Sequence, residues 1–451
     1  MKKQMFRFAA MAVFLLLLAV FLTASAEEIG PDLILRGEID SPLKLEVSEA
    51  VYARLAQFGD DRLESLNKLI RHLGISINMD GDVSETSILV DGDEVFSLTE
   101  AETETGIQTV YSFEPDHAYA SSPESGSAGE TDFTGFLNEQ FFFMNRMLDD
   151  MYPLFGKLTA TFPDFTKDAP ENLSFKGYGK AVRRVSIRFA DDYVKEHFPK
   201  ALADLAVTDE SRRFIEGLIF SGVQRVTLLY DENGNVLRVN YDGLVGQNEE
   251  SIRKVSLVWR NLRTDGQKKD KVTLKTPAVK GYDRYNMTYV REYDVTDPAR
   301  HTTTWNFELD MKAGDVKKKV TFTADLVNEN DELTGKTVYT ERENGLEKKT
   351  TLIPVIRKEN SGQYAGTLEI TKYSGKIIMS SVKASVRLGK GSSVNPKTAA
   401  AVHTEDSSEQ VQETIETLLV QKLLTLPQSD LEFFSKDIPE DVWNAITESL
   451  K

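Results

Sequence analysis

The sequence predicts an α+β protein in which a large antiparallel β-meander, forming a curved sheet or half-barrel, packs against a few amphipathic helices. Two observations support the sheet. Residues 223–390 consist of short runs in which apolar and polar side chains alternate, which is the period of a β-strand. The links between these runs are too short for the crossover helix that parallel strands need. A third observation supports the helices, because other segments repeat apolar residues every three to four positions.

The N-terminal residues 1–26 have the features of a secretion signal. Basic residues precede the unbroken apolar run 8–22, which is shorter than the roughly 20 residues of a membrane-spanning helix. Ala24 and Ala26 then provide the small-x-small pattern that signal peptidase recognises. We therefore expect cleavage after Ala26 and a secreted or extracytoplasmic protein. An uncleaved N-terminal membrane anchor is the alternative.

The region 27–115 is expected to contain a helix and several β-hairpins. Apolar residues recur at helical spacing from Val51 to Ile70, and Gly74 is of the type that commonly ends a helix. Residues 75–98 alternate like strands, and their two Asp-Gly pairs are strong hairpin signals. A further strand is predicted in 106–115.

Residues 116–132 are expected to form a flexible polar loop, because the stretch 121–131 contains no apolar residue larger than Ala. Residues 133–222 should follow as a helical segment with one strand. Its first helix has a wide apolar stripe rich in Phe and Met, which suit adaptable apolar surfaces, and Pro153 ends the pattern. The helix either lines an apolar cavity or is a core helix laid on the sheet. The candidate ligand-binding residues are Phe133, Phe136, Leu137, Phe141, Met144, Met147 and Met151.

The remainder of this region should contain a strand in 182–190 and two shorter helices, near 191–205 and in 208–220. Thr208 is a suitable N-cap for the second helix, and Gly222 is a suitable stop.

From residue 223 to 390 the pattern predicts about ten strands separated by turn residues. A sheet of that size should curl or fold into two layers. In 317–327, Val320 and Phe322 alternate with Thr321 and Thr323, so one face should be apolar and the other wet. Residues 391–451 should be a linker followed by helices in 407–424 and 437–450.

The stretch 231–235, Asp-Glu-Asn-Gly-Asn, has two interpretations. Its oxygen-bearing side chains suit the start of a calcium loop, but Val236 stands where such a loop requires glycine. The flanking residues alternate like strands, and Asn233-Gly234 is a preferred centre of a type I′ turn. A hairpin is the favoured interpretation, and weak calcium binding at the acidic turns stays open.

No motif predicts catalysis, so we expect the protein not to be an enzyme and to need no cofactor. The sequence lacks GxSxG and HExxH, and it contains no cysteine, which excludes disulfides and thiolate chemistry. Two SxxK matches, at 65–68 and 380–383, lack the partner motifs of the penicillin-binding family. Trp259 and Trp305 lie in predicted strands, and packing in the core is favoured over stacking on sugars. The net charge of −17 argues against nucleic acid as a partner.

The export signal, the long meander and the helices able to cover its concave side resemble the half-barrel of bacterial lipoprotein carriers (LolA-like) and of mycobacterial lipid-binding proteins of the LppX and LprG type. The stretch 228–243 is similar to the strand pairs of such folds, and the resemblance covers residues 180–390. It implies an apolar ligand between sheet and helices, and no catalytic residues.

The resulting hypothesis is a secreted bacterial, non-catalytic binding or carrier protein. It would hold an apolar small molecule, a lipid or a cell-envelope protein between a curved sheet and the helix at 133–152. The alternatives are a structural or protein-interaction module of the cell surface, and a secreted hydrolase using carboxylates that the sequence does not single out.

Overall fold

The protein is described here from a computed structural model. Most of the described residues lie in antiparallel strands and few lie in helices. The predicted α+β class is therefore correct in part, because the sheet dominates and the helical content is small. The signal region lies outside the described residues, which are 43–80, 83–103, 106–114, 117–121, 148, 152, 166–168, 173–192, 194–196, 216–246, 248–278, 284–313, 316–360, 363–391 and 417–435.

The chain forms two compact units, each built from stretches that are distant in the sequence. The division passes through β17 (Val316–Glu329), β18 (Glu332–Glu343) and β19 (Leu346–Lys358), so each of these strands contributes residues to both units. Unit 1 comprises Met1–Ser127, Val327–Lys336 and Thr350–Lys451, and unit 2 comprises Ala128–Leu326 and Thr337–Lys349.

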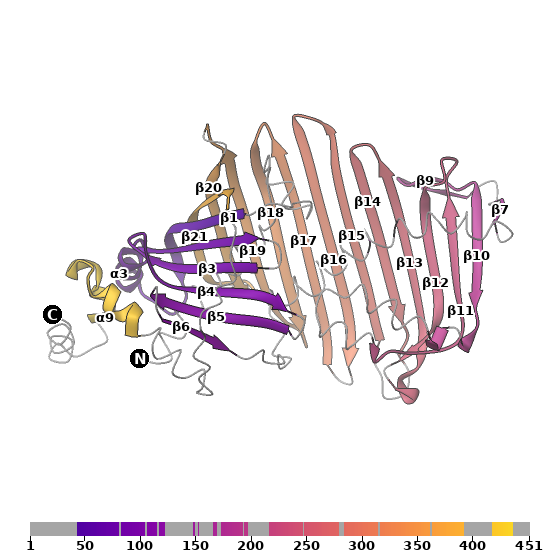
Figure 1. Ribbon diagram of the computed structural model, residues 1–451, viewed down its shortest axis with the longest axis horizontal. Coiled ribbons are helices and arrows are strands. Elements are labelled where there is room, and N and C mark those ends of the chain that lie inside the picture. Colours follow the sequence, from indigo (N-terminus) through magenta and orange to yellow (C-terminus); the bar gives the residue numbers. More distant parts are fainter. Residues whose placement is uncertain are drawn as a thin grey trace. The chain divides into compact units, whose positions relative to one another are not determined.

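Unit 1 contains an antiparallel sheet in which strands from the two ends of the chain are neighbours (Figure 1). β1 pairs with β2 on one side and with β21 on the other, and β21 pairs with β20. From β2 the sheet continues through β3, β4 and β5 to β6. The strands are β1 (Leu43–Leu55), β2 (Leu73–Asp80), β3 (Val83–Val90), β4 (Asp93–Thr103), β5 (Gly106–Glu114), β6 (His117–Ser121), β20 (Tyr364–Ser374) and β21 (Ile377–Lys390).

The first helix, α3 (Asp60–Ile70), is shorter than predicted. Residues 51–55 belong to β1, where pairing with β21 overrides their helical spacing. Gly74 lies in β2 and does not end the helix. The side-chain amide of Asn67 hydrogen-bonds the backbone of Tyr52 in the way that a neighbouring strand would. Asn67 Oδ1 accepts from the Tyr52 N–H at 2.7 Å, and Asn67 Nδ2 donates to the Tyr52 carbonyl at 2.9 Å. These two bonds fix α3 against β1.

The Asp-Gly hairpins are confirmed. β2 and β3 pair up to Asp80 and Val83, and β3 and β4 pair up to Val90 and Asp93. At the second turn Asp91 and Gly92 have φ angles of 52° and 86°, the left-handed pair that a type I′ turn requires. The loop predicted at 116–132 is wrong at its start, because residues 117–121 form β6, which pairs with β5, and residues 122–132 lie outside the described residues.

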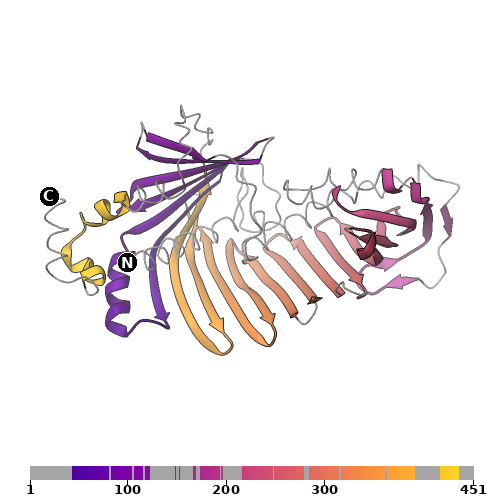
Figure 2. The same ribbon diagram turned by 90° about the horizontal axis from the view of Figure 1, so that it is seen from below.

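The C-terminal segment, residues 417–435, packs against α3 (Figures 1 and 2). Residues 417–423 are helical, in agreement with the predicted helix 407–424, and η4 (Gln428–Asp430) and α9 (Glu432–Ser435) follow. The predicted helix 437–450 lies outside the described residues. The buried side chains that join the segment to α3, β3 and β4 are Leu69, Val90, Val95, Leu423, Leu426 and Leu431.

Unit 2 contains a second run of antiparallel strands, which confirms the predicted meander. β10 lies between β7 and β11, and each strand from β11 to β15 pairs with the next one in the chain. The strands are β7 (Thr166–Asp168), β10 (Arg183–Phe189), β11 (Ile219–Tyr230), β12 (Val236–Gly246), β13 (Arg253–Thr264), β14 (Gln267–Thr276), β15 (Arg284–Asp297), β16 (Arg300–Ala313) and β17 (Val316–Glu329), with the 3-10 turn η3 (Glu249–Ser251) between β12 and β13.

The helix predicted at 208–220, with Gly222 as its stop, is wrong at its end. Ile219 already belongs to β11, and Gly222 lies inside that strand with a φ of 68°, at a shift in the register with β12. The positive φ explains why glycine stands there. Gly222 therefore marks a β-bulge in β11 and not the end of a helix.

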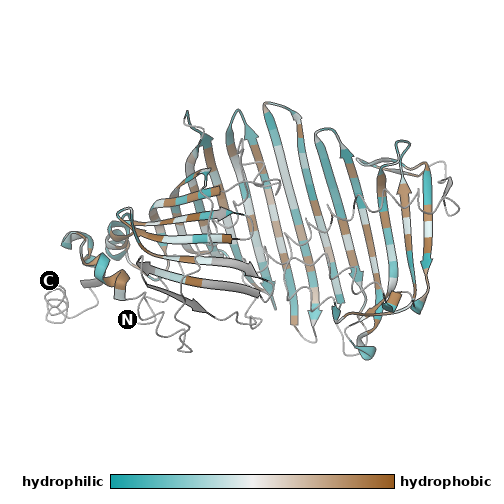
Figure 3. Cartoon of the chain, viewed as in Figure 1, coloured by the Kyte–Doolittle hydropathy of each residue, from teal (hydrophilic) through white to brown (hydrophobic). Residues whose placement is uncertain are grey.

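The alternation predicted for β17 is confirmed. Val320 and Phe322 are buried, whereas Thr321 and Thr323 are only partly buried. Alternating apolar and polar bands are visible along the strands of this region in Figure 3. One face of the strand is therefore an interior face.

Candidate functional site

The stretch 231–235 is a hairpin loop between β11 and β12, as favoured from the sequence. The expected type I′ turn is wrong, since Gly234 is the residue of this loop with a positive φ, 84°. The Asp231 carboxylate accepts from the Asn233 N–H at 2.9 Å and from the Asn235 N–H at 2.7 Å. Because its oxygens accept from the loop's own amides, Asp231 acts as the acceptor of an Asx-type turn.

The most unusual chemistry of unit 2 lies on one face of β13–β16. Strand register places three cross-strand rows side by side on this face. The central row combines polar, charged and aromatic side chains in neighbouring strands. One flanking row is mainly aromatic, and the other is mainly basic and polar. The rows are Trp259–Val272–Tyr289–Phe307, Asn261–Asp270–Arg291–Trp305 and Arg263–Lys268–Tyr293–Thr303.

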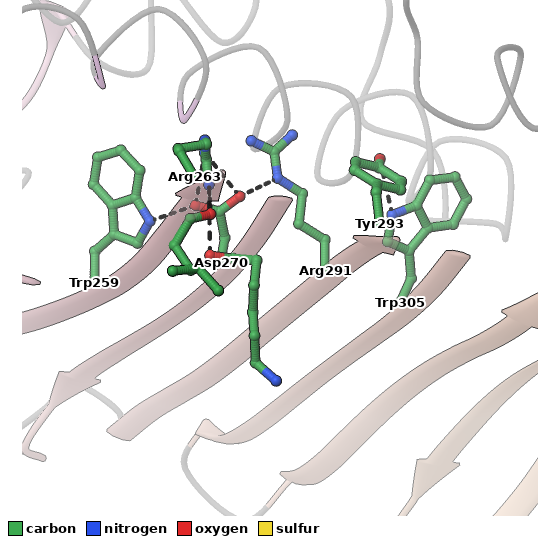
Figure 4. Close-up of polar contacts among 8 residues, drawn as sticks. Trp259, Arg263, Asp270, Arg291, Tyr293 and Trp305 are labelled. Carbon is green, nitrogen blue, oxygen red and sulfur yellow. Dashed lines mark hydrogen bonds and ion pairs between the residues drawn. The ribbon is translucent and has the colours of Figure 1, made fainter. Parts of the chain in front are cut away.

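Asp270 is the centre of a buried hydrogen-bond network, shown in Figure 4. Its carboxylate accepts from Trp259 Nε1 at 2.8 Å and from Arg291 Nε at 2.5 Å. Arg263 Nη2 donates to both carboxylate oxygens, at 2.9 and 3.1 Å. The side chains of Asp270 and Arg291 are 0% exposed, and that of Arg263 is 17% exposed. Three strands therefore contribute to one ionic cluster, which we call the Asp270 cluster.

The cluster costs desolvation energy that its contacts must offset. Removing two charges from water costs several kcal/mol for each ion, on the order of what a well-made pair recovers. A carboxylate with four accepted hydrogen bonds satisfies its lone pairs, which is the condition under which a buried pair is tolerated. The pairing also opposes a register slip, because a shift by one residue would turn Asp270 and Arg291 to opposite faces.

Asn261 occupies the position opposite Asp270 in the neighbouring strand. It is 0% exposed, and neither its amide nitrogen nor its amide oxygen has a hydrogen-bond partner among the described residues. A buried amide in that state costs about 1–3 kcal/mol. Asn261 therefore offers one donor group and one acceptor to a water or to a polar group of a ligand.

Aromatic rings surround the cluster. Tyr289 and Phe307 are 0% and 1% exposed. Trp305 Nε1 donates to the Tyr293 hydroxyl at 3.1 Å, and the two rings meet edge to face at 6.2 Å. Both Trp259 and Trp305 are buried, in agreement with the interpretation that they pack in the core.

The predicted apolar helix is represented among the described residues by Leu148 and Tyr152, which both have helical backbone. Leu148 is 1% exposed. The Tyr152 ring meets Trp259 edge to face at 6.4 Å, and the Arg263 guanidinium lies 4.8 Å from its centroid. Burial raises the pKa of the Tyr152 hydroxyl. The candidate residues Phe133, Phe136, Leu137, Phe141, Met144, Met147 and Met151 all lie outside the described residues.

A small hairpin, β8 (Ser174–Phe175) and β9 (Gly179–Lys180), contributes a second aromatic contact to unit 2. Phe175 lies under two guanidinium groups, those of Arg238 at 5.3 Å and Arg260 at 5.7 Å. Burial and the charge of Arg260 lower the pKa of Arg238. Lys269 lies 5.5 Å from the centroid of Tyr178. These contacts bury the stems of basic side chains and stabilise the hairpin on the sheet.

Within the described part of the chain, no group of three or more His, Asp or Glu side chains could hold a metal ion. The helices described are also too short or too polar to cross a membrane. Ser65 of the first SxxK match lies inside α3, where its hydroxyl donates to the Asp61 carbonyl at 3.1 Å, and the second match lies in β21.

No protein-family model and no curated protein sequence matches the chain. Among solved structures, it is similar to OmpT, an outer membrane protein of Vibrio cholerae. The loop L8 deletion mutant has 9% identity and a TM-score of 0.24, with 77% of this chain and 96% of that chain covered. The in-vitro folded trimer form has 7% identity and a TM-score of 0.25, with the same coverage. TM-scores this low do not define a common fold.

Sequence reasoning missed the Asp270 cluster, although a signal for it exists. Arg263, Asp270 and Arg291 stand at strand positions of the same parity as Trp259, Val272 and Tyr289. Charged residues at the same alternate positions of a strand as apolar ones point to the same face of the sheet, so they indicate buried charges. Only the register shows that these charges meet.

Proposed function

We propose that the chain is a non-catalytic binding protein of the cell envelope that holds an apolar ligand against the aromatic face of β13–β16. The helix at 133–152 would cover the ligand. The observation that carries the proposal is the contact of Tyr152 with Trp259 and Arg263, since it brings that helix to a face rich in aromatic rings. A half-barrel curvature of the sheet, as in the LolA-like carriers, is part of this proposal.

The proposed ligand has a polar group at one end. Asn261 is buried on the same face with an unpaired donor and an unpaired acceptor, beside the Asp270 carboxylate. An acid, amide or alcohol head group would satisfy it, and the surrounding rings would contact the apolar part. The predicted secretion signal at residues 1–26 fits an extracytoplasmic location.

Native mass spectrometry of the secreted protein, followed by solvent extraction, tests the proposal. We expect a co-purifying apolar molecule, or uptake of added oleate by protein that has been stripped. Binding should be lost when Phe136, Met144 and Met147 are changed together to Ser. Leu346→Ser is the control, because this apolar side chain in unit 2 is 79% exposed. A clean apo mass with no uptake of oleate would contradict the proposal.

A protein-interaction module of the cell surface is the second candidate, and one observation favours it. The Asp270–Arg291 pair is fully buried and already satisfied across the middle of the face. A buried ion pair in the middle of the face interrupts its apolar surface, which is expected of a filled core rather than of a continuous apolar cavity. If oleate does not bind while circular dichroism shows a folded sheet, the second candidate is preferred.

A further inference from the structure

His72 connects two parts of unit 1 that are far apart in the sequence. The residue stands between the end of α3 and the start of β2. Its Nδ1 lies 2.6 Å from Asp91 Oδ1, in the turn between β3 and β4. Its Nε2 lies 2.9 Å from Asp430 Oδ2, in η4 of the C-terminal segment. The side chain is 21% exposed, so water reaches it.

The protonation state of the ring follows from this geometry. A neutral imidazole has one N–H and one lone pair, whereas an imidazolium has two N–H groups. Both ring nitrogens face carboxylate oxygens, which accept and do not donate when ionised. Only the imidazolium can donate to both. Loss of its proton would leave a lone pair facing one of the two carboxylates.

We propose that His72 is a pH-operated latch that holds the C-terminal segment 417–435 on α3 and the β3–β4 turn when protonated, and weakens that hold when it loses its proton. This inference does not depend on the function proposed for unit 2.

The other described contacts of the segment change little near neutral pH. Leu423, Leu426 and Leu431 pack on the apolar side of α3 and β4, and the Phe433 ring meets Phe58 edge to face at 5.6 Å. Lysine–carboxylate pairs keep their charges across this range. The charged groups around the latch are Asp91 and Asp430 on His72 itself, Lys68 with Glu432 at 3.4 Å, and Lys422 with Asp93 at 2.7 Å.

The direction of the pH effect is set by two shifts. Desolvation opposes the charge of His72, but the hydrogen bonds to Asp91 and Asp430 outweigh it and raise its pKa. The hydrogen bond from His72 lowers the pKa of Asp430. The contribution of His72 to the stability of the docked segment is complete below its unfolded pKa of about 6.5. It is lost as the pH rises through its raised folded pKa. That of Asp430 is present above about pH 3.9 and is lost as the pH falls through its lowered pKa.

Hydrogen exchange of residues 417–435 in the full chain tests the latch. After correction for the intrinsic exchange rate, the protection factor should fall about fivefold between about pH 5.5 and pH 8.5. This fall is at the upper end of the effects known for partly exposed ion pairs. His72→Gln should remove this fall. Lys422→Met is the matched control: it removes the 2.7 Å contact with Asp93, so it should lower protection at both pH values and keep the fall. An equal fall in the wild type and in His72→Gln would overturn the proposal.

An NMR titration of the unmodified protein keeps the proposal testable if His72→Gln does not fold. The chain has five histidines, so the ring resonances can be assigned individually. We expect His72 to titrate above about pH 6.5, with the amide shifts of Asp430 and Leu431 following the same curve. A His72 pKa at or below that value, or amide shifts that do not follow it, would overturn the latch.

Discussion

The Asp270 cluster predicts a specific pattern of stabilities. In Arg291→Met the Asp270 carboxylate loses one of its three partners but keeps Trp259 and Arg263. The loss should be near the lower end of the range for breaking a buried pair, about 3 kcal/mol. Asp270→Leu leaves two guanidinium groups, of which that of Arg291 is 0% exposed, and the loss should be near the upper end, about 5 kcal/mol.

The double variant Asp270→Asn with Arg291→Met tests whether the loss comes from an unpaired charge. Asn keeps an acceptor for the Trp259 N–H and removes the charge that Arg291 had compensated. With the single variant Asp270→Asn measured alongside Arg291→Met, the double variant should lose at least about 1 kcal/mol less than the sum of those two single losses.

Urea unfolding is the assay, followed by tryptophan fluorescence, because Trp259 and Trp305 both report on unit 2. Arg284→Met is the matched control on the same strand, since Arg284 and Asp310 form a pair at 2.8 Å with side chains 49% and 40% exposed. This control should lose less than about 1 kcal/mol. A loss in Arg291→Met as small as in Arg284→Met, or additive losses in the double variant, would refute the reasoning.

Three further predictions concern other parts of the chain. In Gly366→Ala the new Cβ would lie 1.9 Å from the Val355 carbonyl oxygen, so two backbones must separate and the loss should reach about 3 kcal/mol; an unchanged melting temperature would contradict this. Asn261→Leu should be neutral or stabilising by up to about 1 kcal/mol if nothing binds the amide, and a loss above about 1 kcal/mol in urea would indicate a bound polar group. Asp231→Ala should cost about 1–2 kcal/mol by loss of its loop hydrogen bonds, and calcium chloride should not change the melting temperature of the wild type; a calcium-dependent rise that Asp231→Ala abolishes would show that the loop binds the ion.

The local features of the sheet could be predicted because their signals are local. Alternation in residues 317–327 identified the buried face of β17, and the Asp-Gly pair at 91–92 specified a two-residue hairpin. Both depend on side-chain periodicity and on backbone angles that glycine and aspartate adopt readily. No distant contact is needed for either.

The features that the sequence did not predict all depend on distant partners. Residues 51–55 have helical spacing, but pairing with β21 makes them part of β1. Asp270 and Arg291 form a pair only once the register of β14 and β15 is known. His72 belongs to a pattern of scattered histidines, and its two carboxylates are supplied by a turn and by the C-terminal segment.

The pairing of β1 with β21 makes the two ends of the chain dependent on each other during folding. Ser385 Oγ donates to the Glu49 carboxylate at 2.9 Å across a sequence separation of 336 residues. Contacts of such separation form late, because the loop that they close is long. Until β21 emerges, β1 can pair on one side with β2 and presents an open edge that favours aggregation. A chain truncated before residue 377 lacks β21 and should therefore be removed by proteolysis. The sheet of unit 1 should fold only once both β1 and β21 are present.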